Sequence, residues 1–236
     1  MVEDRMNKEF ESTQYDQIYY SGGADKIYDL PYRQSGYFPL FQEVLRTLKA
    51  NGATSVLEVG CGTGGFAHLL FDQGGRVRYR GFDFSGVAVD RSRARTRRSD
   101  LFFVGDARRP DSYAGEFDSI VCTEVLEHIN CDLEVIENWR PGIFCVCSVP
   151  NFDADNHVRF FCSKGEVQQR YGTLIDIKSV VQIKKPVLLD ISWRGYARAL
   201  RWNRYRPRQV MEILGMTSFD KEGGWYVFSG PRRGKG

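Results

Sequence analysis

An apolar segment that ends in an acid and continues into alternating glycines constrains this chain more than any other feature. Residues 56–64 read VLEVGCGTG. Because glycine lacks a Cβ atom, such a loop allows the backbone to approach a ligand closely. The helix expected after the loop offers backbone N–H groups at the same place. The segment therefore predicts a buried strand, a tight turn and a binding site for a nucleotide-type cofactor.

Two classes of cofactor fit this loop. Gly60, Gly62 and Gly65 match the G-x-G-x-x-G spacing of dinucleotide-binding proteins, and Asp83 follows at a suitable distance. A pyrophosphate disfavours a neighbouring anion, however, and Glu58 lies at the end of the predicted strand. A carboxylate there suits the ammonium group of a methionine moiety. This difference favours a sulfonium donor over a dinucleotide.

Residues 55–151 resemble the class I S-adenosylmethionine-dependent methyltransferases, whose first motif is E-x-G-x-G-x-G. The resemblance implies a Rossmann-like α/β fold, S-adenosyl-L-methionine as the cofactor, and methyl transfer as the reaction. It implies that Asp83 accepts hydrogen bonds from the ribose hydroxyls and that Phe84 lies beside the adenine ring. It also implies that Asp106, with Ala107, lies at the adenine-reading position, where the acid accepts a hydrogen bond from the adenine amine. The cofactor-binding residues expected on this basis are Glu58, Gly60, Gly62, Gly64, Asp83, Phe84, Asp106, Ala107 and Glu124.

Strand-like and helix-like segments alternate along the chain, which predicts a doubly wound, mostly parallel, seven-stranded sheet. We expect a single domain, 1–236, with an N-terminal helical lid (1–50), a cofactor-binding core (51–150) and a C-terminal part (151–236) that holds a substrate-side insertion and edge strands. The strands expected are 55–59, 77–82, 101–104, 117–122, 143–149 and a final edge strand at 225–229. A further strand lies within 174–183 or near residue 218. The tyrosine-rich leader either folds over the cofactor as a lid or packs on the core.

The composition is that of a globular protein. The chain has 236 residues, of which 42% are hydrophobic and 14% aromatic. It has no run of about 18 apolar residues and no apolar stretch at its start, so we expect a cytoplasmic protein with no membrane partner. Six cysteines without C-x-x-C spacing, beside three histidines, predict buried thiols in a reducing compartment.

The net charge of the chain does not identify a binding partner. The net charge of +3 is too small to require a polyanion. Arginines gather between residues 194 and 208, where they could line a face toward phosphate or a polar substrate. We expect a small-molecule substrate and keep nucleic acid as the alternative partner. The sequence makes no prediction about the oligomeric state.

The segment after the fourth predicted strand, residues 124–129, reads EVLEHI. It resembles the methyltransferase subgroup that includes the ubiquinone-biosynthesis O-methyltransferases, and it also resembles the small-RNA terminal 2′-O-methyltransferases. The second resemblance implies a site for Mg²⁺ or another divalent cation with the ligands Glu124, Glu127, His128 and His157. The first three side chains converge only if the segment forms one helical turn. Metal binding stays open here, because methyltransferases without a metal share the pattern.

Methyl transfer from a sulfonium to a hydroxyl needs an aligned nucleophile and a group that accepts its proton. His128 and His157 are the expected catalytic bases, since the ordinary pKa of histidine suits proton transfer near neutral pH. The expected acceptor is the oxygen, before the nitrogen, of a small metabolite or sugar. The alternatives are a metal-dependent RNA 2′-O-methyltransferase and a cofactor-binding module without turnover.

Overall fold

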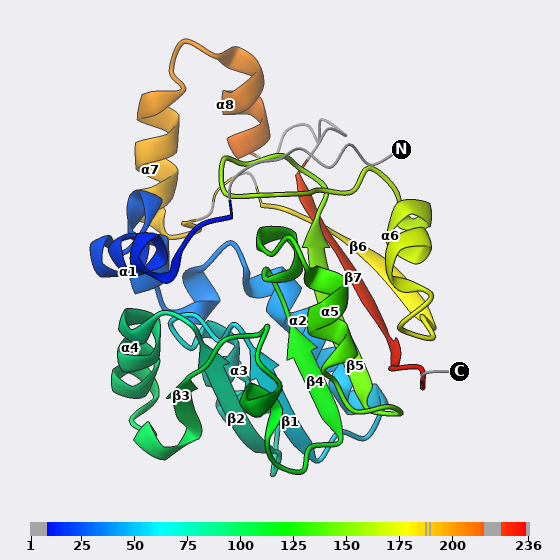
Figure 1. The fold of residues 1–236 in the computed structure, drawn as a ribbon. Coiled ribbons are helices and arrows are strands. Elements are labelled where there is room, and N and C mark those ends of the chain that lie inside the picture. Colours follow the sequence, from blue (N-terminus) through cyan, green and yellow to red (C-terminus); the bar gives the residue numbers. More distant parts are fainter. Residues whose placement is uncertain (1–8, 187, 189, 215–222, 235–236) are drawn as a thin grey trace.

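The computed structural model describes residues 9–186, 188, 190–214 and 223–234. One seven-stranded sheet forms its centre, in the order β3-β2-β1-β4-β5-β7-β6, and helices cover both faces (Figure 1). The strands are β1 Ser55–Val59, β2 Arg78–Asp83, β3 Phe102–Val104, β4 Ser119–Cys122, β5 Phe144–Pro150, β6 Ser179–Lys184 and β7 Gly224–Pro231. The first five pair in parallel, which confirms the predicted Rossmann-like, doubly wound fold.

The last strand of the chain is not an edge strand. β7 pairs antiparallel with β5 on one side and with β6 on the other. The expectation of an edge at 225–229 was wrong, because the apolar run there reflects burial on both faces of an interior strand. The half-buried and exposed strand β6 forms the edge instead, at the first of the two positions considered. The other position, near residue 218, lies outside the described residues.

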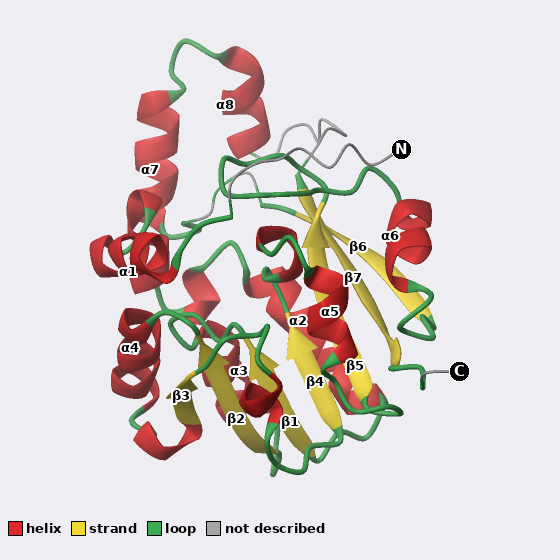
Figure 2. Ribbon diagram, in the orientation of Figure 1, coloured by secondary structure: helices red, strands yellow, loops and turns green. Residues whose placement is uncertain are grey.

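Helices alternate with the parallel strands (Figure 2). The α-helices are α1 Ser12–Ser21, α2 Phe38–Ala50, α3 Gly65–Gln73, α4 Gly86–Thr96, α5 Asp132–Glu137, α6 Lys164–Tyr171, α7 Trp193–Trp202 and α8 Pro207–Ile213. The 3₁₀ helices are η1 Ala24–Asp29, η2 Tyr32–Gln34, η3 Ser99–Leu101, η4 Pro110–Tyr113 and η5 Leu126–His128. Ser85 caps α4, because its hydroxyl accepts the N–H of Ala88.

Two hydrophobic cores hold the helices on the sheet. Leu40 of α2, Phe66 of α3 and Val89 of α4 belong to one core, on one face. Val135 of α5 and Val167 of α6 belong to the other. All six cysteines are free thiols; four are buried as expected, whereas Cys131 is half-buried and Cys162 is exposed. In the part of the chain that the structure describes, every helix is too short or too polar to cross a bilayer.

The strand order reverses between β2 and β4, which flank the first strand β1. In open parallel sheets, ligands bind at the carboxyl ends of the strands beside such a reversal. Helix α1 lies at this end of the sheet and packs against α4 (Figure 1). The topology thus places the glycine loop, the ends of β2 and β4, and the leader around one region.

Candidate active site

The glycine loop adopts the backbone that its sequence predicts. Gly60, Gly62 and Gly64 all have positive φ angles, of 70°, 51° and 76°. A Cβ atom on Gly60 would lie 2.2 Å from Cγ2 of Val125, so no larger residue fits there. Gly64 is the N-cap of α3. The loop is therefore a tight turn that exposes the main chain beside the end of β1.

Two cavities meet beside this loop. Cavity A has a volume of about 70 Å³, and its walls include Asp83, Phe84, Asp106 and Ala107. Cavity B has a volume of about 410 Å³, and its walls include Glu58, Gly62 and His157. Five residues line both cavities, namely Tyr15, Tyr19, Gly60, Glu124 and His128. The structure thus gathers the predicted site residues around two connected spaces, except for Gly64 and Glu127, which line neither.

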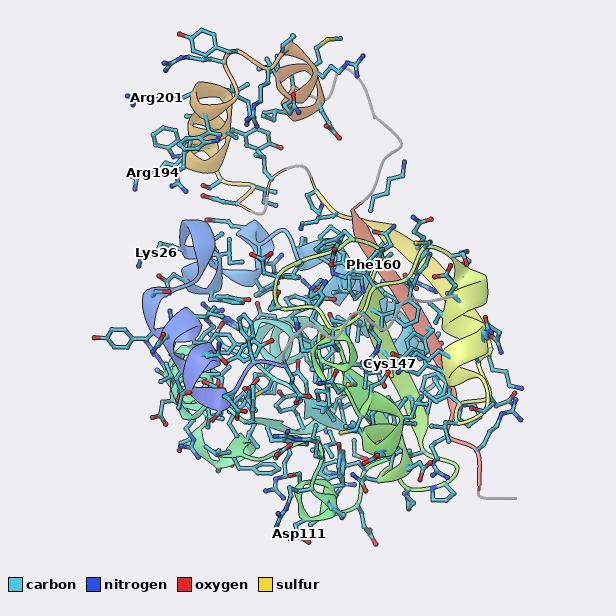
Figure 3. The ribbon with its side chains drawn as sticks, turned by 45° about the horizontal axis from the view of Figure 1, so that its top comes forward. Lys26, Asp111, Cys147, Phe160, Arg194 and Arg201 are labelled. Atoms are coloured by element: carbon cyan, nitrogen blue, oxygen red, sulfur yellow. The ribbon has the colours of Figure 1, made fainter. Side chains whose placement is uncertain are left out.

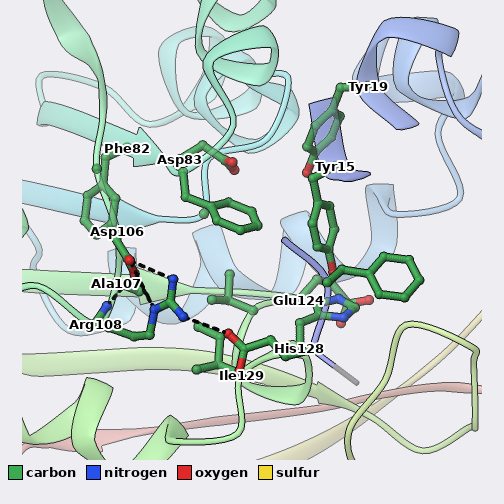
Figure 4. Close-up of a pocket in the computed structure, with 16 residues that line it drawn as sticks. Tyr15, Tyr19, Phe82, Asp83, Asp106, Ala107, Arg108, Glu124, His128 and Ile129 are labelled. Atoms are coloured by element: carbon green, nitrogen blue, oxygen red, sulfur yellow. Dashed lines mark hydrogen bonds and ion pairs between the residues drawn. The ribbon is translucent and has the colours of Figure 1, made fainter. Parts of the chain in front are cut away.

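Asp83 ends β2 as a buried carboxylate in the wall of cavity A (Figure 4). Its two oxygens accept the backbone N–H groups of Gly62 and Ser85, each at 2.9 Å. Burial raises the pKa of this carboxyl to about 6, although the two N–H groups oppose that shift. Each oxygen keeps a second lone pair, so the carboxylate can hold the loop and accept further hydrogen bonds from a ligand.

Glu58 lies at the end of β1 in the wall of cavity B and is almost fully buried. It accepts a hydrogen bond from the hydroxyl of Tyr79 on β2. Burial raises the pKa of Glu58 to about 8, so the protonated form is favoured at neutral pH. A ligand cation beside it would favour the carboxylate.

At the far end of cavity A, Asp106 is bound to Arg108. The guanidinium donates to both carboxylate oxygens, with an Nη2–Oδ2 distance of 2.8 Å (Figure 4). Arg108 also forms an ion pair with Glu9 of the leader at 3.2 Å. The hydrogen bonds and charge of Arg108 outweigh the effect of burial, so the pKa of Asp106 is lowered and its carboxylate stays ionised.

The acids after β4 form a buried pair. Glu124 has a positive φ of 57°, and its backbone N–H donates to Oγ of Ser148 at 3.1 Å. Burial raises the pKa of Glu124 to about 7. Glu127 is completely buried, and its carboxyl oxygens have no hydrogen-bond partner among the described residues. Burial and the neighbouring Glu124 together raise the pKa of Glu127 well above its ordinary value.

His128 and His157 lie with their ring centroids 5.1 Å apart. Nδ1 of His128 is 2.7 Å from the carbonyl oxygen of Asn156, and Nδ1 of His157 is 3.2 Å from that of Phe152. A carbonyl only accepts, so each Nδ1 carries the proton and each Nε2 carries a lone pair. Burial lowers the pKa of His128 to about 4 and lowers the pKa of His157 as well. Both rings are therefore neutral, and able to accept a proton, at pH 7.

Three of the four predicted metal ligands come together. Glu127, His128 and His157 each place a ligand atom within 4.8 Å of the others. The helical turn expected over residues 124–128 does not form, because only Leu126–His128 is helical, and Glu124 stays outside the group. The Nε2 lone pairs of the two imidazoles and, once it has lost its proton, the Glu127 carboxylate are donors that a divalent cation binds. The residues present therefore fit such an ion.

Helix α1 is the part of the site that sequence patterns locate least well. Tyr15 and Tyr19 project from it to the boundary between the cavities (Figure 4). Asp16 accepts the hydroxyl of Ser85 at 2.5 Å, and Arg91 of α4 donates to the carbonyl of Tyr19. Clustered tyrosines indicated a lid or a core segment, and Tyr15 is both buried and part of the cavity walls, so its position is compatible with either. No motif marks Asp16 or Arg91, which attach the helix.

A nucleotide-type site at the strand-order reversal of a doubly wound sheet defines a Rossmann-like cofactor-binding protein. The family model described as "Methyltransferase domain" matches residues 32–160, which is more than half of the chain. The chain therefore belongs to the methyltransferase domain family. No curated protein sequence matches it.

Solved methyltransferase structures share the fold. Magnesium protoporphyrin IX methyltransferase (ChlM) from Synechocystis PCC 6803, with bound SAM, is 16% identical, with 97% of this chain and 100% of that chain covered and a TM-score of 0.58. The N-methyltransferase NodS from Bradyrhizobium japonicum, in complex with S-adenosyl-L-homocysteine, is 20% identical, with coverages of 81% and 85% and a TM-score of 0.53. The methyltransferase domain of bacterial CtHen1-CN is 18% identical, with coverages of 81% and 97% and a TM-score of 0.51. At these identities the likeness concerns the fold.

Proposed function

We propose that this chain is an enzyme that uses S-adenosyl-L-methionine to methylate an oxygen, in preference to a nitrogen, of a small metabolite or sugar. The observation that carries the proposal is the meeting of cavity A and cavity B at Gly60, Glu124 and His128. A donor that lies across this boundary presents its methyl group toward an acceptor in cavity B. Bound SAM in ChlM and S-adenosyl-L-homocysteine in NodS support the choice of cofactor.

The cofactor is assigned to the two cavities by its parts. Its adenine ring lies in cavity A beside Phe84, Asp106 and Ala107, and its ribose hydroxyls donate to Asp83. Its methionine end lies along the glycine loop toward Glu58. Cavity A, at about 70 Å³, is smaller than the roughly 300 Å³ typical of small-molecule sites. We therefore expect α1, with its two tyrosines, to move outward when the cofactor enters.

The transfer step is an in-line displacement at the methyl carbon. The acceptor oxygen forms a bond to this carbon as the carbon–sulfur bond breaks, and the sulfonium becomes a neutral thioether. The hydroxyl proton passes to a base, for which we assign Nε2 of His157, with His128 as the second candidate. Both imidazoles are neutral at pH 7 and can accept the proton, and the pKa of about 4 makes His128 the weak base of a second candidate. The EVLEHI segment supports placement in the subgroup of the ubiquinone-biosynthesis O-methyltransferases.

Thermal unfolding with candidate cofactors tests the proposal. S-adenosylmethionine at about 100 times its Kd is expected to stabilise the protein by about 2.7 kcal/mol. NADH at the same concentration serves as the control and is expected to leave the melting temperature unchanged. Stabilisation by NADH and not by S-adenosylmethionine would indicate that the glycine loop binds a dinucleotide. Stabilisation without methyl transfer to any hydroxyl or amine acceptor would support a binding module without turnover.

A second candidate function is metal-dependent 2′-O-methylation of RNA. The grouping of Glu127, His128 and His157 favours it, and bacterial CtHen1-CN shares the fold. These residues would hold the cation, which when bound supplies Lewis-acid binding of substrate hydroxyls. Inhibition by added RNA that weakens as salt rises would support this function over a small-molecule substrate.

Metal binding is tested directly with two neighbouring acids. Titration of Mn²⁺ into chelator-treated protein is expected to give a calorimetric signal, and Glu127→Gln is expected to abolish it, because that change removes the only carboxylate of the group. Glu124→Gln is the matched control, since this neighbouring acid is half-buried and lies outside the group. Absence of Mn²⁺ binding in the parent protein, or equal binding in the Glu127→Gln variant, would eliminate the metal site.

A further inference from the structure

Helices α7 and α8 form a hairpin, residues 192–214, that projects beyond the carboxyl ends of the strands (Figures 1 and 3). Its base is joined to the leader, because the N–H of Ile191 donates to the carbonyl of Gln34 at 3.1 Å and Asp190 forms a bridge with Ser35. Beyond this base, the two helices pack mainly against each other. The hairpin therefore adds little to the core of the fold.

Two aromatic residues lie at the tip of the hairpin, where the helices are joined. Trp202 is 80% exposed and Tyr205 is 83% exposed. Arginines surround them, and the guanidinium of Arg204 lies 4.8 Å from the centroid of the Tyr205 ring. Trp and Tyr combine an apolar body with a polar group, a combination that is enriched at the level of lipid headgroups. The tip thus exposes the residue types that are common at the membrane–water interface.

Helix α7 separates its apolar and charged side chains. Trp193, Tyr196 and Leu200 follow the spacing i, i+3 and i+7 and lie along one side. Three arginines with the spacing i, i+4 and i+7 lie along the neighbouring side, and they are Arg194, Arg198 and Arg201. The two of these labelled in Figure 3, Arg194 and Arg201, extend from the same side of the helix. This arrangement is typical of helices that lie in a membrane interface.

The positive charge of the molecule is concentrated in this hairpin. Residues 192–214 contain six arginines and a single acid, Glu212, whereas the whole chain has a net charge of only +3. A compact cluster of arginines attracts a polyanionic surface within a Debye length. Its partner must therefore combine dense negative charge with an environment for exposed aromatic and aliphatic side chains.

We propose that the hairpin docks the protein on an anionic phospholipid bilayer, with Trp202 and Tyr205 inserted among the headgroups and the arginines on the lipid phosphates. An RNA would accept the arginines and could stack on the exposed aromatic rings, but Leu200 of α7, the exposed Met211 of α8 and the exposed Leu214 just after it take no part in base stacking. Acyl chains accept such aliphatic groups. The sequence alone predicted no membrane partner, because that prediction considered spanning segments only.

Co-sedimentation with lipid vesicles tests this docking. The protein is expected to bind phosphatidylcholine vesicles that contain phosphatidylglycerol, less strongly at high salt, and not to bind phosphatidylcholine alone. Its tryptophan fluorescence should shift to the blue on binding, because Trp193 and Trp202 are exposed whereas Trp139 and Trp225 are already buried. Each arginine near a membrane contributes about fivefold to partitioning, so Arg204→Gln with Arg208→Gln should weaken binding roughly 25-fold.

Replacement of both tip aromatics, Trp202→Ala with Tyr205→Ala, is expected to weaken vesicle binding and to reduce the fluorescence shift, of which only the part from Trp193 remains. Tyr20→Ala is the matched control, since Tyr20 is 85% exposed on α1, and should bind vesicles like the parent protein. All these side chains are exposed, so circular dichroism and the melting temperature should stay unchanged. No binding to anionic vesicles overturns the proposal. The proposal is also overturned if the tip variant still binds vesicles but loses the ability to bind an oligonucleotide. The same holds if the tip variant still binds vesicles but no longer forms an oligomer that the parent protein forms.

Discussion

Replacement of His157 by alanine is expected to lower kcat by about 10²- to 10⁴-fold and to leave the Kd for S-adenosylmethionine nearly unchanged. The proposed role of His157 is to accept the hydroxyl proton during transfer, an interaction made in the transition state and not in the cofactor complex. His157 lines cavity B but not cavity A, in which the adenosine part is assigned. Single-turnover kinetics with labelled cofactor, beside calorimetry, measures both quantities.

His68→Ala is the control for the loss of an imidazole, because His68 lies on α3 and contributes to neither cavity wall. It should keep the parent rate. The pH dependence gives a further check. A base is active in its neutral form, so the rate falls as pH drops through its pKa. Burial lowers the pKa of His157, which places this acid limb below the ordinary histidine value of about 6.5. An unchanged rate in His157→Ala would remove this residue from the mechanism.

Asp83→Ala is expected to weaken cofactor binding by about 100-fold. Two hydrogen bonds from ribose hydroxyls to a buried carboxylate account for a loss of this size. The same change leaves the backbone N–H groups of Gly62 and Ser85 without their acceptor, so the free energy of unfolding should also fall by about 1–3 kcal/mol. Calorimetry of cofactor binding at a temperature where the variant remains folded separates the two effects.

Asp118→Ala provides the matched comparison for stability. Asp118 accepts the N–H groups of Thr54 and Ser55, at 2.9 and 3.0 Å, at the start of β1 and so at the opposite end of the sheet from the cavities. It should therefore lose a similar amount of stability while keeping full affinity for the cofactor. Equal weakening of cofactor binding in both variants would mean that Asp83 acts through stability and does not contact the ribose.

Local sequence patterns predicted the parallel half of the fold well. The run 55–59 became β1 with the same bounds. The antiparallel half was predicted less well, because pairing partners lie far apart in the chain. An apolar run such as 225–229 indicates burial, but the position of β7 between β5 and β6 depends on which strands dock beside it.

Local sequence patterns likewise predicted one part of the candidate site and not the other. Residues that are neighbours in the sequence were enough to predict the glycine loop and the acids at the ends of β1 and β2. Spacing did not predict the geometry of Glu124, whose positive φ takes it out of the helical turn. The leader was predicted as a lid or a core segment, but spacing did not predict how α1 is attached, because Asp16 reaches Ser85 across 69 residues of sequence.

The sequence by itself determined the fold class and the position of the glycine loop, because both depend on interactions between residues a few positions apart. Tertiary structure decided which distant side chains meet: His128 with His157, α1 with the cavities, and β7 with β6. It also decided which apolar residues stay exposed, as at Trp202. Burial depends on how the whole chain packs, and no local pattern contains that information.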